Sequence, residues 1–470
     1  MKDELDYLTI SEAGRLLRQK KVSPLELTKA ALERIEALNP RLNVFITVTA
    51  ERALREARAA EREIARGKYR GPLHGIPVTL KDNICAAGVR TTAGSKILGE
   101  FIPPADAEVA RKLSRAGTVL LGKTNLHEFA YGVTTENPHY GPTRNPWNLE
   151  CMPGGSSGGS AAGVATALGF ASVGTDTGGS IRIPAALCGI VGLKPNFQRI
   201  SCKGIIPLAV TLDHAGPIAR TVADAAIMLD AICEHEEAQG AFYKAARGGL
   251  QKRGKKAWLR LGWPREYFFE RVDAEVERAI EAAVKVFEKL GAQMEEVSLP
   301  HIGESVEPST QIALAEALEY HESQGYFPAH AADYGEDVRK RLEMGGAVRA
   351  VDYLKAQQAR EQVRADFREA FERVDAIIAP TAPVAAPRIG EDSVKIGGES
   401  QSVRGALVRM NRPANFTGFP VISVPCGFTR SGLPIGMALH GAQWGEAKLL
   451  QIAARYEDAT EWHERRPILR

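Results

Sequence analysis

Apolar residues recur at helical spacing over the first 66 residues of the chain. They follow one another every three or four positions, the period of one helix face, at Leu27, Ala31, Ile35 and Leu38. The segment Ser23–Glu26 precedes them with the pattern of a capping box, and its proline suits the first helical position. We therefore predict a helix here, an earlier helix after the similar segment Thr9–Glu12, and a third over the Ala/Arg/Glu-rich stretch 50–66.

Short apolar runs bounded by glycine or proline replace this period after Gly71. Runs of four to six such residues are typical of buried strands, and they lie at 76–80, 118–121, 375–380 and 420–425. Helical stretches separate these runs, as at 107–116 and across much of 300–375. An alternation of this kind predicts an α/β fold.

Composition narrows the class of protein. The 470 residues are 44% hydrophobic and 25% charged, which is typical of a folded globular protein. The 60 Lys and Arg residues nearly balance the 57 Asp and Glu residues, so the net charge of +3 favours neither a nucleic-acid groove nor an anionic membrane surface. The six cysteines form no C-x-x-C pair, and the charged first ten residues do not resemble a signal peptide. No apolar run is long enough to span a membrane, so we expect a cytoplasmic protein.

Three patterns match other enzyme classes only in part. Gly117–Thr124 fits the P-loop expression, but its four central residues are themselves strand-like, so we interpret it as a strand with glycine at each end. Gly154–Gly158 fits the nucleophile elbow of Ser-His-Asp hydrolases, yet the preceding 148–153 is polar and ends in proline, where an elbow needs an apolar strand. The second histidine of the zinc motif H-E-x-x-H is missing from both His-Glu pairs, 127–128 and 321–322.

A lysine and a glycine-rich segment carry the remaining candidate chemistry. Lys81 directly follows the apolar run 76–80, where a lysine can be partly desolvated; a solvent-exposed loop lysine is the alternative. Nine of the 27 residues in 154–180 are glycine, so backbone N–H groups are free of side-chain crowding. Ser180 follows two of these glycines, which could aim N–H groups at one point as an oxyanion hole requires.

Taken together, these segments closely resemble the amidase signature family, over roughly residues 5–467. The two serines of the signature, Ser156 and Ser180, are 24 residues apart, as in that family. The segments that match are Lys81, Gly154–Ser160, Gly178–Pro184, Gly189–Pro195, Leu212–Thr221 and Ser423–Gly427. The resemblance implies an enzyme that hydrolyses carboxylic amides.

The resemblance also implies the architecture. We expect an α/β amidase signature fold, in which helices cover both faces of a mixed β-sheet. The whole chain, 1–470, would form one such domain. Its expected parts are an N-terminal helical arm (1–66), a signature core with the catalytic residues (67–235) and a variable substrate-binding insert (300–410).

The family uses a Ser-cisSer-Lys triad, which implies a role for each of three residues. By position, Ser180 is the nucleophile, Ser156 the bridging serine after a cis peptide bond, and Lys81 the base. Lysine serves as a base only when neutral, so work near pH 7 requires a pKa about three units below 10.4, or roughly 4 kcal/mol. Burial without a paired carboxylate could supply that shift, provided that the adjacent Asp82 points elsewhere.

The remaining site residues are likewise implied by the resemblance. The oxyanion hole would consist of backbone N–H groups from Thr177, Gly178, Gly179 and Ser180. The acyl group would lie against Phe129, Ala130 and Tyr131, although simple core packing is an alternative for these three. No metal and no cofactor are expected.

Three functions remain open at this point. One is a stand-alone amidase, acting on aryl or alkyl amides and in some cases on esters or carbamates. Another is the glutaminase A subunit of a tRNA-dependent amidotransferase, which Lys81–Ile84 and Asn145–Asn148 resemble strongly. The last is a binding protein without activity, which the intact triad disfavours.

Departures from the subunit pattern favour the stand-alone amidase. One position matches the subunit: Arg364 falls where the subunit has an arginine for the glutamine α-carboxylate. The subunit's acidic residue for the α-amino group, five positions before the proline equivalent to Pro413, is Val408 here, and Ile183 stands where it usually has glutamine. We therefore expect a small-molecule amide as substrate, no direct contact with nucleic acid or membrane, and a monomer or homodimer.

Overall fold

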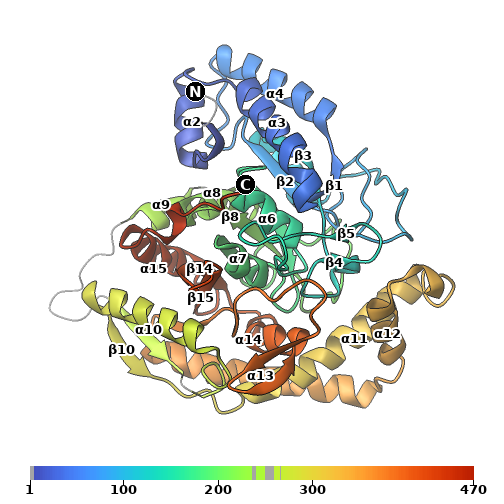
Figure 1. Cartoon of the computed structure of the whole chain (residues 1–470), viewed down its shortest axis with the longest axis vertical. Coiled ribbons are helices and arrows are strands. Elements are labelled where there is room, and N and C mark those ends of the chain that lie inside the picture. The colour runs from blue at the N-terminus through green and yellow to red at the C-terminus, as the bar shows by residue number, and fades with distance from the viewer. Residues whose placement is uncertain (1–4, 235–239, 249–258, 265, 470) are drawn as a thin grey trace.

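An eleven-stranded sheet runs through the molecule (Figure 1). A computed structural model describes residues 5–234, 240–248, 259–264 and 266–469. In spatial order the strands are β1 (Phe45–Val48), β3 (Val119–Thr124), β2 (Pro77–Lys81), β6 (Ala171–Asp176), β8 (His214–Ala219), β7 (Val191–Lys194), β14 (Val421–Phe428), β15 (Pro434–His440), β11 (Ala376–Pro380), β9 (Arg260–Trp263) and β10 (Gln293–Glu296).

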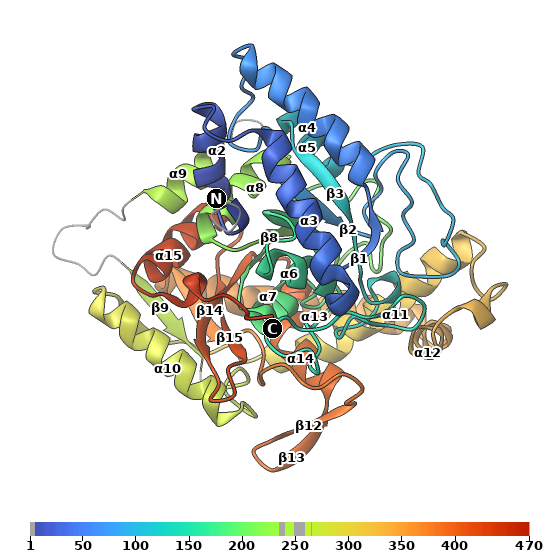
Figure 2. The same cartoon turned by 45° about the horizontal axis from the view of Figure 1, so that its top comes forward.

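The sheet is mixed, as expected. Strands β3, β2 and β6 are parallel near one end, and β11, β9 and β10 are parallel at the other. The strands between these groups, and β1 on the first edge, pair antiparallel. Two small antiparallel pairs lie outside this sheet: β4 (Glu136–Asn137) with β5 (Gly141–Pro142), and the projecting hairpin β12 (Ser393–Ile396) with β13 (Glu399–Ser402) (Figure 2).

Helices cover both faces of the sheet, which confirms the predicted fold class. Along β11, Ala376 and Ile378 face one hydrophobic cluster while Ile377 and Ala379 face another, because side chains alternate along a strand. The first cluster lies under α2 (Ile10–Arg18), α5 (Glu108–Ala116), α8 (Val222–Ile232), α9 (Ala241–Arg247), α10 (Ala274–Lys289) and α15 (Glu446–Asp458).

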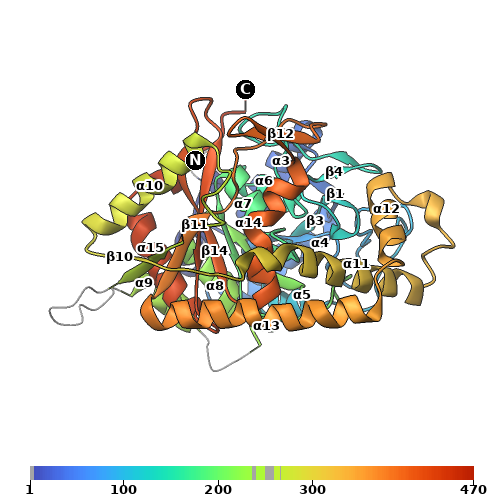
Figure 3. The same cartoon turned by 90° about the horizontal axis from the view of Figure 1, so that it is seen from below.

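The opposite face carries two groups of helices. One group packs near β1 to β8: α3 (Pro24–Leu42), α4 (Ala50–Ala65), α6 (Gly158–Ala165) and α7 (Arg182–Cys188). The other group packs near β11 and consists of α11 (Val306–Ser323), α12 (Glu336–Gly345), α13 (Ala350–Arg373) and α14 (Val403–Thr417). Its longest helix, α13, lies along the lower side of the molecule in Figure 3.

The N-terminal helices begin where the sequence predicts. Thr9 and Ser23 each form a full capping box, with Glu12 and Glu26 returning hydrogen bonds to the cap backbone. The structure adds strand β1 between α3 and α4, which the pattern did not predict. Assignment of 300–410 as a substrate-binding insert stays a prediction.

Strand β2 determines which way the candidate lysine points. Val78 and Leu80 belong to the cluster under α2 and α8, so Thr79 and Lys81 face the side on which α6 and α7 lie. None of the helices among the described residues is long and apolar enough to cross a membrane.

Candidate active site

Lys81 lies completely buried at the end of β2 and contacts two hydroxyl groups. Its Nζ is 2.6 Å from Ser156 Oγ and 2.7 Å from Thr175 Oγ1. Ser156 is fully buried as well, and the peptide bond between Gly155 and Ser156 is cis. The structure thus brings together two residues that are 75 positions apart in the sequence.

Burial lowers the pKa of Lys81 to about 7, although the carboxylates of Asp176 and Asp213 oppose the shift. The nearest carboxylate in sequence does not interfere, because Asp82 Oδ1 accepts a hydrogen bond from Lys123 Nζ at 3.0 Å and Asp82 Oδ2 accepts from Thr92. A neutral amine is therefore accessible near pH 7, as a lysine base requires.

The P-loop match and the nucleophile-elbow match both lack the structural context that those motifs require. The middle of the P-loop match is strand β3, and its Lys123 is buried in the ion pair with Asp82. The elbow match at Ser156 follows an irregular segment, 152–155, and not a strand. Neither stretch has the context that a phosphate cradle or a nucleophile elbow requires.

Ser180 lies in the turn between β6 and α7, and it is 5% exposed. Its carbonyl accepts a hydrogen bond from the Ser157 N–H at 3.2 Å, which joins the nucleophile segment to the cis-serine segment. The Ser157 hydroxyl also lies 3.2 Å from the Thr175 carbonyl oxygen. Two glycine-rich segments are thereby held side by side around Lys81.

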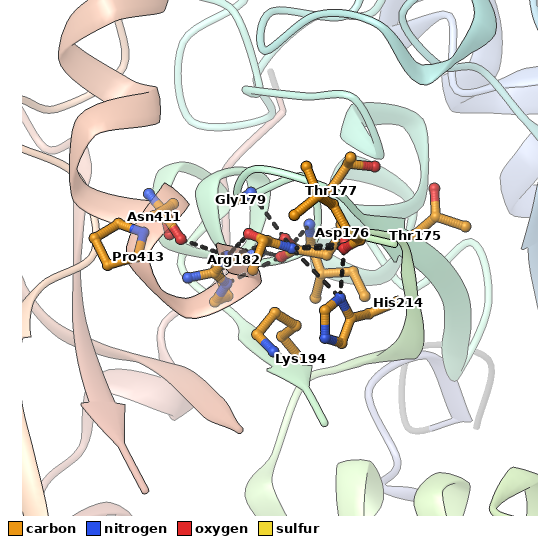
Figure 4. Close-up of polar contacts among 12 residues, drawn as sticks. Thr175, Asp176, Thr177, Gly179, Arg182, Lys194, His214, Asn411 and Pro413 are labelled. Atoms are coloured by element: carbon orange, nitrogen blue, oxygen red, sulfur yellow. Dashed lines mark hydrogen bonds and ion pairs between the residues drawn. The ribbon is translucent and has the colours of Figure 1, made fainter. Parts of the chain in front are cut away.

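A buried ion pair anchors the turn that carries Ser180 (Figure 4). Asp176 accepts hydrogen bonds from the Arg182 guanidinium at 2.9 and 3.0 Å and from Asn415 Nδ2 at 2.9 Å. Burial opposes ionisation of Asp176, but the Arg182 charge outweighs it, so the pKa of Asp176 lies below its ordinary value. Arg182 also donates to the Asn411 carbonyl oxygen, which ties the turn to α14.

The predicted oxyanion-hole residues differ in what their N–H groups do. The Gly179 N–H donates to Asp176 Oδ1 at 2.8 Å and is therefore already engaged. The N–H groups of Thr177, Gly178 and Ser180 have no acceptor within the described residues. The Thr177 hydroxyl donates to Asp213 at 2.5 Å, which fixes this side of the turn.

The three predicted acyl-site residues are buried but have different surroundings. Phe129 and Ala130 both have positive φ angles, 48° and 58°. Phe129 packs edge-on against His321, with ring centroids 4.4 Å apart, inside an aromatic cluster. Tyr131 belongs to the same hydrophobic cluster, and its ring also lies against arginine side chains, with Arg341 Cζ 5.2 Å from its centroid.

Two supporting residues, Thr175 and Asp213, escaped the sequence analysis. Thr175 lies in strand β6 and accepts a hydrogen bond from Lys81, while Asp213 accepts from Thr177 and from two backbone N–H groups. Burial raises the pKa of Asp213 to about 6. Asp213 lies inside the matched segment Leu212–Thr221, so the motif offered a signal that we did not use.

The residues that distinguish the amidotransferase subunit have defined positions too. Val408 and Ile183 belong to one hydrophobic cluster, so the two departures from the subunit pattern occur together. Arg364 is occupied by other partners: Nε donates to the Thr417 carbonyl oxygen at 2.8 Å and Nη1 to Glu361 at 2.5 Å.

Comparisons with known proteins show the family of the chain. A family model described as Amidase matches residues 26–450, so the chain belongs to the amidase signature family and is an enzyme that cleaves amide C–N bonds. A curated relative, the A subunit of glutamyl-tRNA(Gln) amidotransferase from Geotalea daltonii, is 43% identical over 99% of this chain and all of its own length.

Solved structures give the same class. A structure described as an amidase is 36% identical, with a TM-score of 0.87 over 96% of this chain and 99% of that chain. The A subunit of glutamyl-tRNA(Gln) amidotransferase from Thermotoga maritima is 35% identical, with a TM-score of 0.78 over 97% of this chain and 95% of that chain.

These relatives correct one expectation. We expected a small-molecule amide substrate, no direct contact with nucleic acid or membrane, and a monomer or homodimer. The expectations about substrate, nucleic acid and oligomeric state are wrong, because the curated relatives carry the name of one subunit in an enzyme named for glutamyl-tRNA(Gln). Val408 and Ile183 are therefore compatible with high overall similarity to an A subunit.

Proposed function

We propose that this chain is the amide-hydrolysing A subunit of a tRNA-dependent amidotransferase, and that it releases ammonia from glutamine. The support is the 43% identity to a curated A subunit across 99% of this chain. In this proposal the chain works in the cytoplasm with at least one further subunit. No disulfide joins the described residues, which is in keeping with that compartment.

The observation that carries the chemistry is the contact between Lys81 and Ser156. In the proposed mechanism, neutral Lys81 takes a proton from Ser156, which takes one from the Ser180 hydroxyl as Ser180 Oγ attacks the amide carbonyl carbon. The distance of 2.6 Å and the pKa of about 7 both support this role for Lys81.

The rest of the cycle follows from the same groups. The free N–H groups of Thr177, Gly178 and Ser180 would stabilise the negative oxygen of the tetrahedral intermediate. As the C–N bond breaks, the leaving nitrogen takes the proton back from Lys81 through Ser156. Water then gives a proton to Lys81 through Ser156 as its oxygen attacks the acyl carbon, and the Ser180 oxygen takes that proton back as the acid leaves. Phe129, Ala130 and Tyr131 would line the acyl group.

The proposal is tested with the tagged chain purified from its own cells. We expect at least one further subunit to copurify, and ammonia release from L-glutamine to increase when glutamyl-tRNA(Gln) is added. Ser180→Ala should abolish ammonia release while the assembly stays intact. Turnover of p-nitroacetanilide by the chain alone, with glutamine left intact, would overturn the glutaminase assignment.

A second candidate is hydrolysis of an amide other than glutamine. The apolar Val408 favours it, since the α-ammonium of glutamine would find no carboxylate at this position. The matched variant Val408→Asp separates the two: a gain in glutamine turnover would show that the native residue selects against an ammonium group.

A further inference from the structure

Three arginines from two helices lie near Tyr131. Arg341 of α12 lies 5.2 Å from the ring centroid, and Arg404 of α14 lies 5.8 Å from it. Arg412, two turns after Arg404 on α14, is close enough to act electrostatically on both Arg404 and Tyr131. We call these four residues the arginine cluster.

The cluster has more positive charge than its surroundings neutralise. Arg341 forms an ion pair with Asp337 at 2.8 Å and also donates to the Tyr131 carbonyl oxygen. Neither Arg404 nor Arg412 has a carboxylate within ion-pair distance in the part of the chain that the structure describes. An uncompensated buried charge costs several kcal/mol, so the buried Arg412, with the half-buried Arg404 on the same helix, calls for an explanation.

Two buried donors of the cluster lack acceptors. Arg412 is 4% exposed, and its Nη1 donates to Ser309 Oγ at 3.2 Å, but its Nε has no hydrogen-bond partner within the described residues. The hydroxyl of Tyr131, a residue 2% exposed, has none there either. More than nine in ten buried polar groups have a partner in folded proteins, so two orphans in one cluster mark a place for an acceptor.

Arg412 lies directly against the nucleophile turn. A Cβ atom added to Gly178 would be only 2.8 Å from Arg412 Nε. Gly178 belongs to the proposed oxyanion hole and precedes Ser180 by two residues. A group held by Arg412 would therefore lie beside a substrate that reacts with Ser180.

We propose that Arg412, with Arg404 and the Tyr131 hydroxyl, binds a carboxylate group of the amide substrate. This inference rests on the proposed amide hydrolysis at Ser180. A planar guanidinium matches a carboxylate in shape and charge. The site therefore fits an amide that also carries a carboxylate, as glutamine does, because Val408, one turn before Arg412, is apolar and adds no carboxylate that would compete for the arginines.

The test compares three amides that differ in one group each: L-glutamine, glutaramate, which lacks the α-amino group, and butyramide, which also lacks the carboxylate. We expect the wild-type chain, with any subunits that copurify, to prefer glutaramate to butyramide in kcat/KM. Arg412→Met should reduce this preference by about 10- to 150-fold through a higher KM, the range for a charge-assisted hydrogen bond. Tyr131→Phe, a milder change, should reduce it about threefold.

Two matched arginine variants serve as controls on α13. Arg368→Met removes an exposed charge and should leave the preference unchanged. Arg364→Met removes the arginine that the subunit pattern would assign to the carboxylate. If Arg364→Met abolishes the preference and Arg412→Met does not, the inference is wrong.

Binding is measured separately from turnover by titrating glutaramate into Ser180→Ala. Loss of glutaramate binding in Ser180→Ala/Arg412→Met supports the carboxylate site. If the wild-type chain hydrolyses none of the three amides, the proposed function is overturned, and the binding result still tests the carboxylate site. Amide hydrolysis with an unchanged preference in Arg412→Met would overturn the inference and leave the proposed function standing. Melting curves of Arg412→Met and Arg412→Gln identify a folding defect.

Discussion

Asp82 turns its carboxylate to Lys123, 3.0 Å away, and not to its neighbour in sequence, Lys81. Both members of the pair are fully shielded from solvent. The pair therefore removes from the active site the one negative charge that sequence adjacency would have supplied. Burial is then the largest influence on the pKa of Lys81, so the amine loses its proton near pH 7.

Breaking this pair should destabilise the protein. Asp82→Asn leaves Lys123 charged and buried without a counter-ion, so we expect the free energy of unfolding to fall by about 3–5 kcal/mol. The double variant Asp82→Asn/Lys123→Met should recover most of that loss. Chemical denaturation of the three proteins measures both effects; an equal loss in the single and double variants would contradict the argument.

The rate of hydrolysis should rise as pH increases through about 7. Lys81 acts as a base only when it has lost its proton, and its pKa lies at about 7. We expect kcat/KM for the preferred amide to reach a plateau above pH 8, and Lys81→Met to lower this plateau by about 10²- to 10⁴-fold and to remove the rise through pH 7. A profile that rises only near pH 10 would show that Lys81 is charged in the folded protein.

Lys81 should also contribute a pH-dependent stability. Between pH 7 and its ordinary pKa, the unfolded chain binds a proton at this lysine and the folded chain does not, so stability increases with pH in that window. Lys81→Met should remove this increase and raise the melting temperature near pH 7. Thermal melts at pH 7 and pH 9.5 measure the difference.

Thr175→Val should affect the reaction through the position of Lys81. The variant keeps the shape of the side chain but removes the hydroxyl that lies 2.7 Å from Lys81 Nζ. Because that hydroxyl accepts a hydrogen bond from the amine, its loss should move the acidic limb of the pH profile below 7 and lower kcat about tenfold. A loss of rate without movement of the limb would indicate a general packing effect.

His321 should make the folded protein sensitive to acid. Burial lowers the pKa of His321 to about 4, while Tyr334 lies 2.7 Å from its Nδ1 and Phe129 packs against its ring. Between pH 6.5 and 4 only the unfolded chain is protonated there, so stability falls as pH decreases, by up to about 1.4 kcal/mol per pH unit. We expect His321→Phe to show a smaller fall across this range in denaturation experiments.

Local sequence was sufficient for the parts of the molecule that depend on local rules. The capping boxes at Thr9 and Ser23 and the strand that ends at Lys81 follow from residues within a few positions of one another. Strand β1 was missed because its four residues lie between two strongly helical patterns, and it is a strand through pairing with β3.

The arginine cluster could not be predicted from local pattern. Tyr131, Arg341 and Arg412 come from segments about 70 to 280 positions apart, and only packing of α12 and α14 beside the turn brings them together. Each arginine alone resembles a solvated surface residue. Their proposed role in binding follows from their shared surroundings in the fold and not from their residue type.

Helix α14 combines two sets of side chains along neighbouring stripes. Asn411 and Asn415 hold the turn of the nucleophile, while positions 404, 408 and 412 recur at four-residue intervals beside it. Exchanges along the second stripe can therefore alter which amide is accepted while the first stripe keeps the reactive serine in place. Such a helix separates the choice of amide from the chemistry that cleaves it.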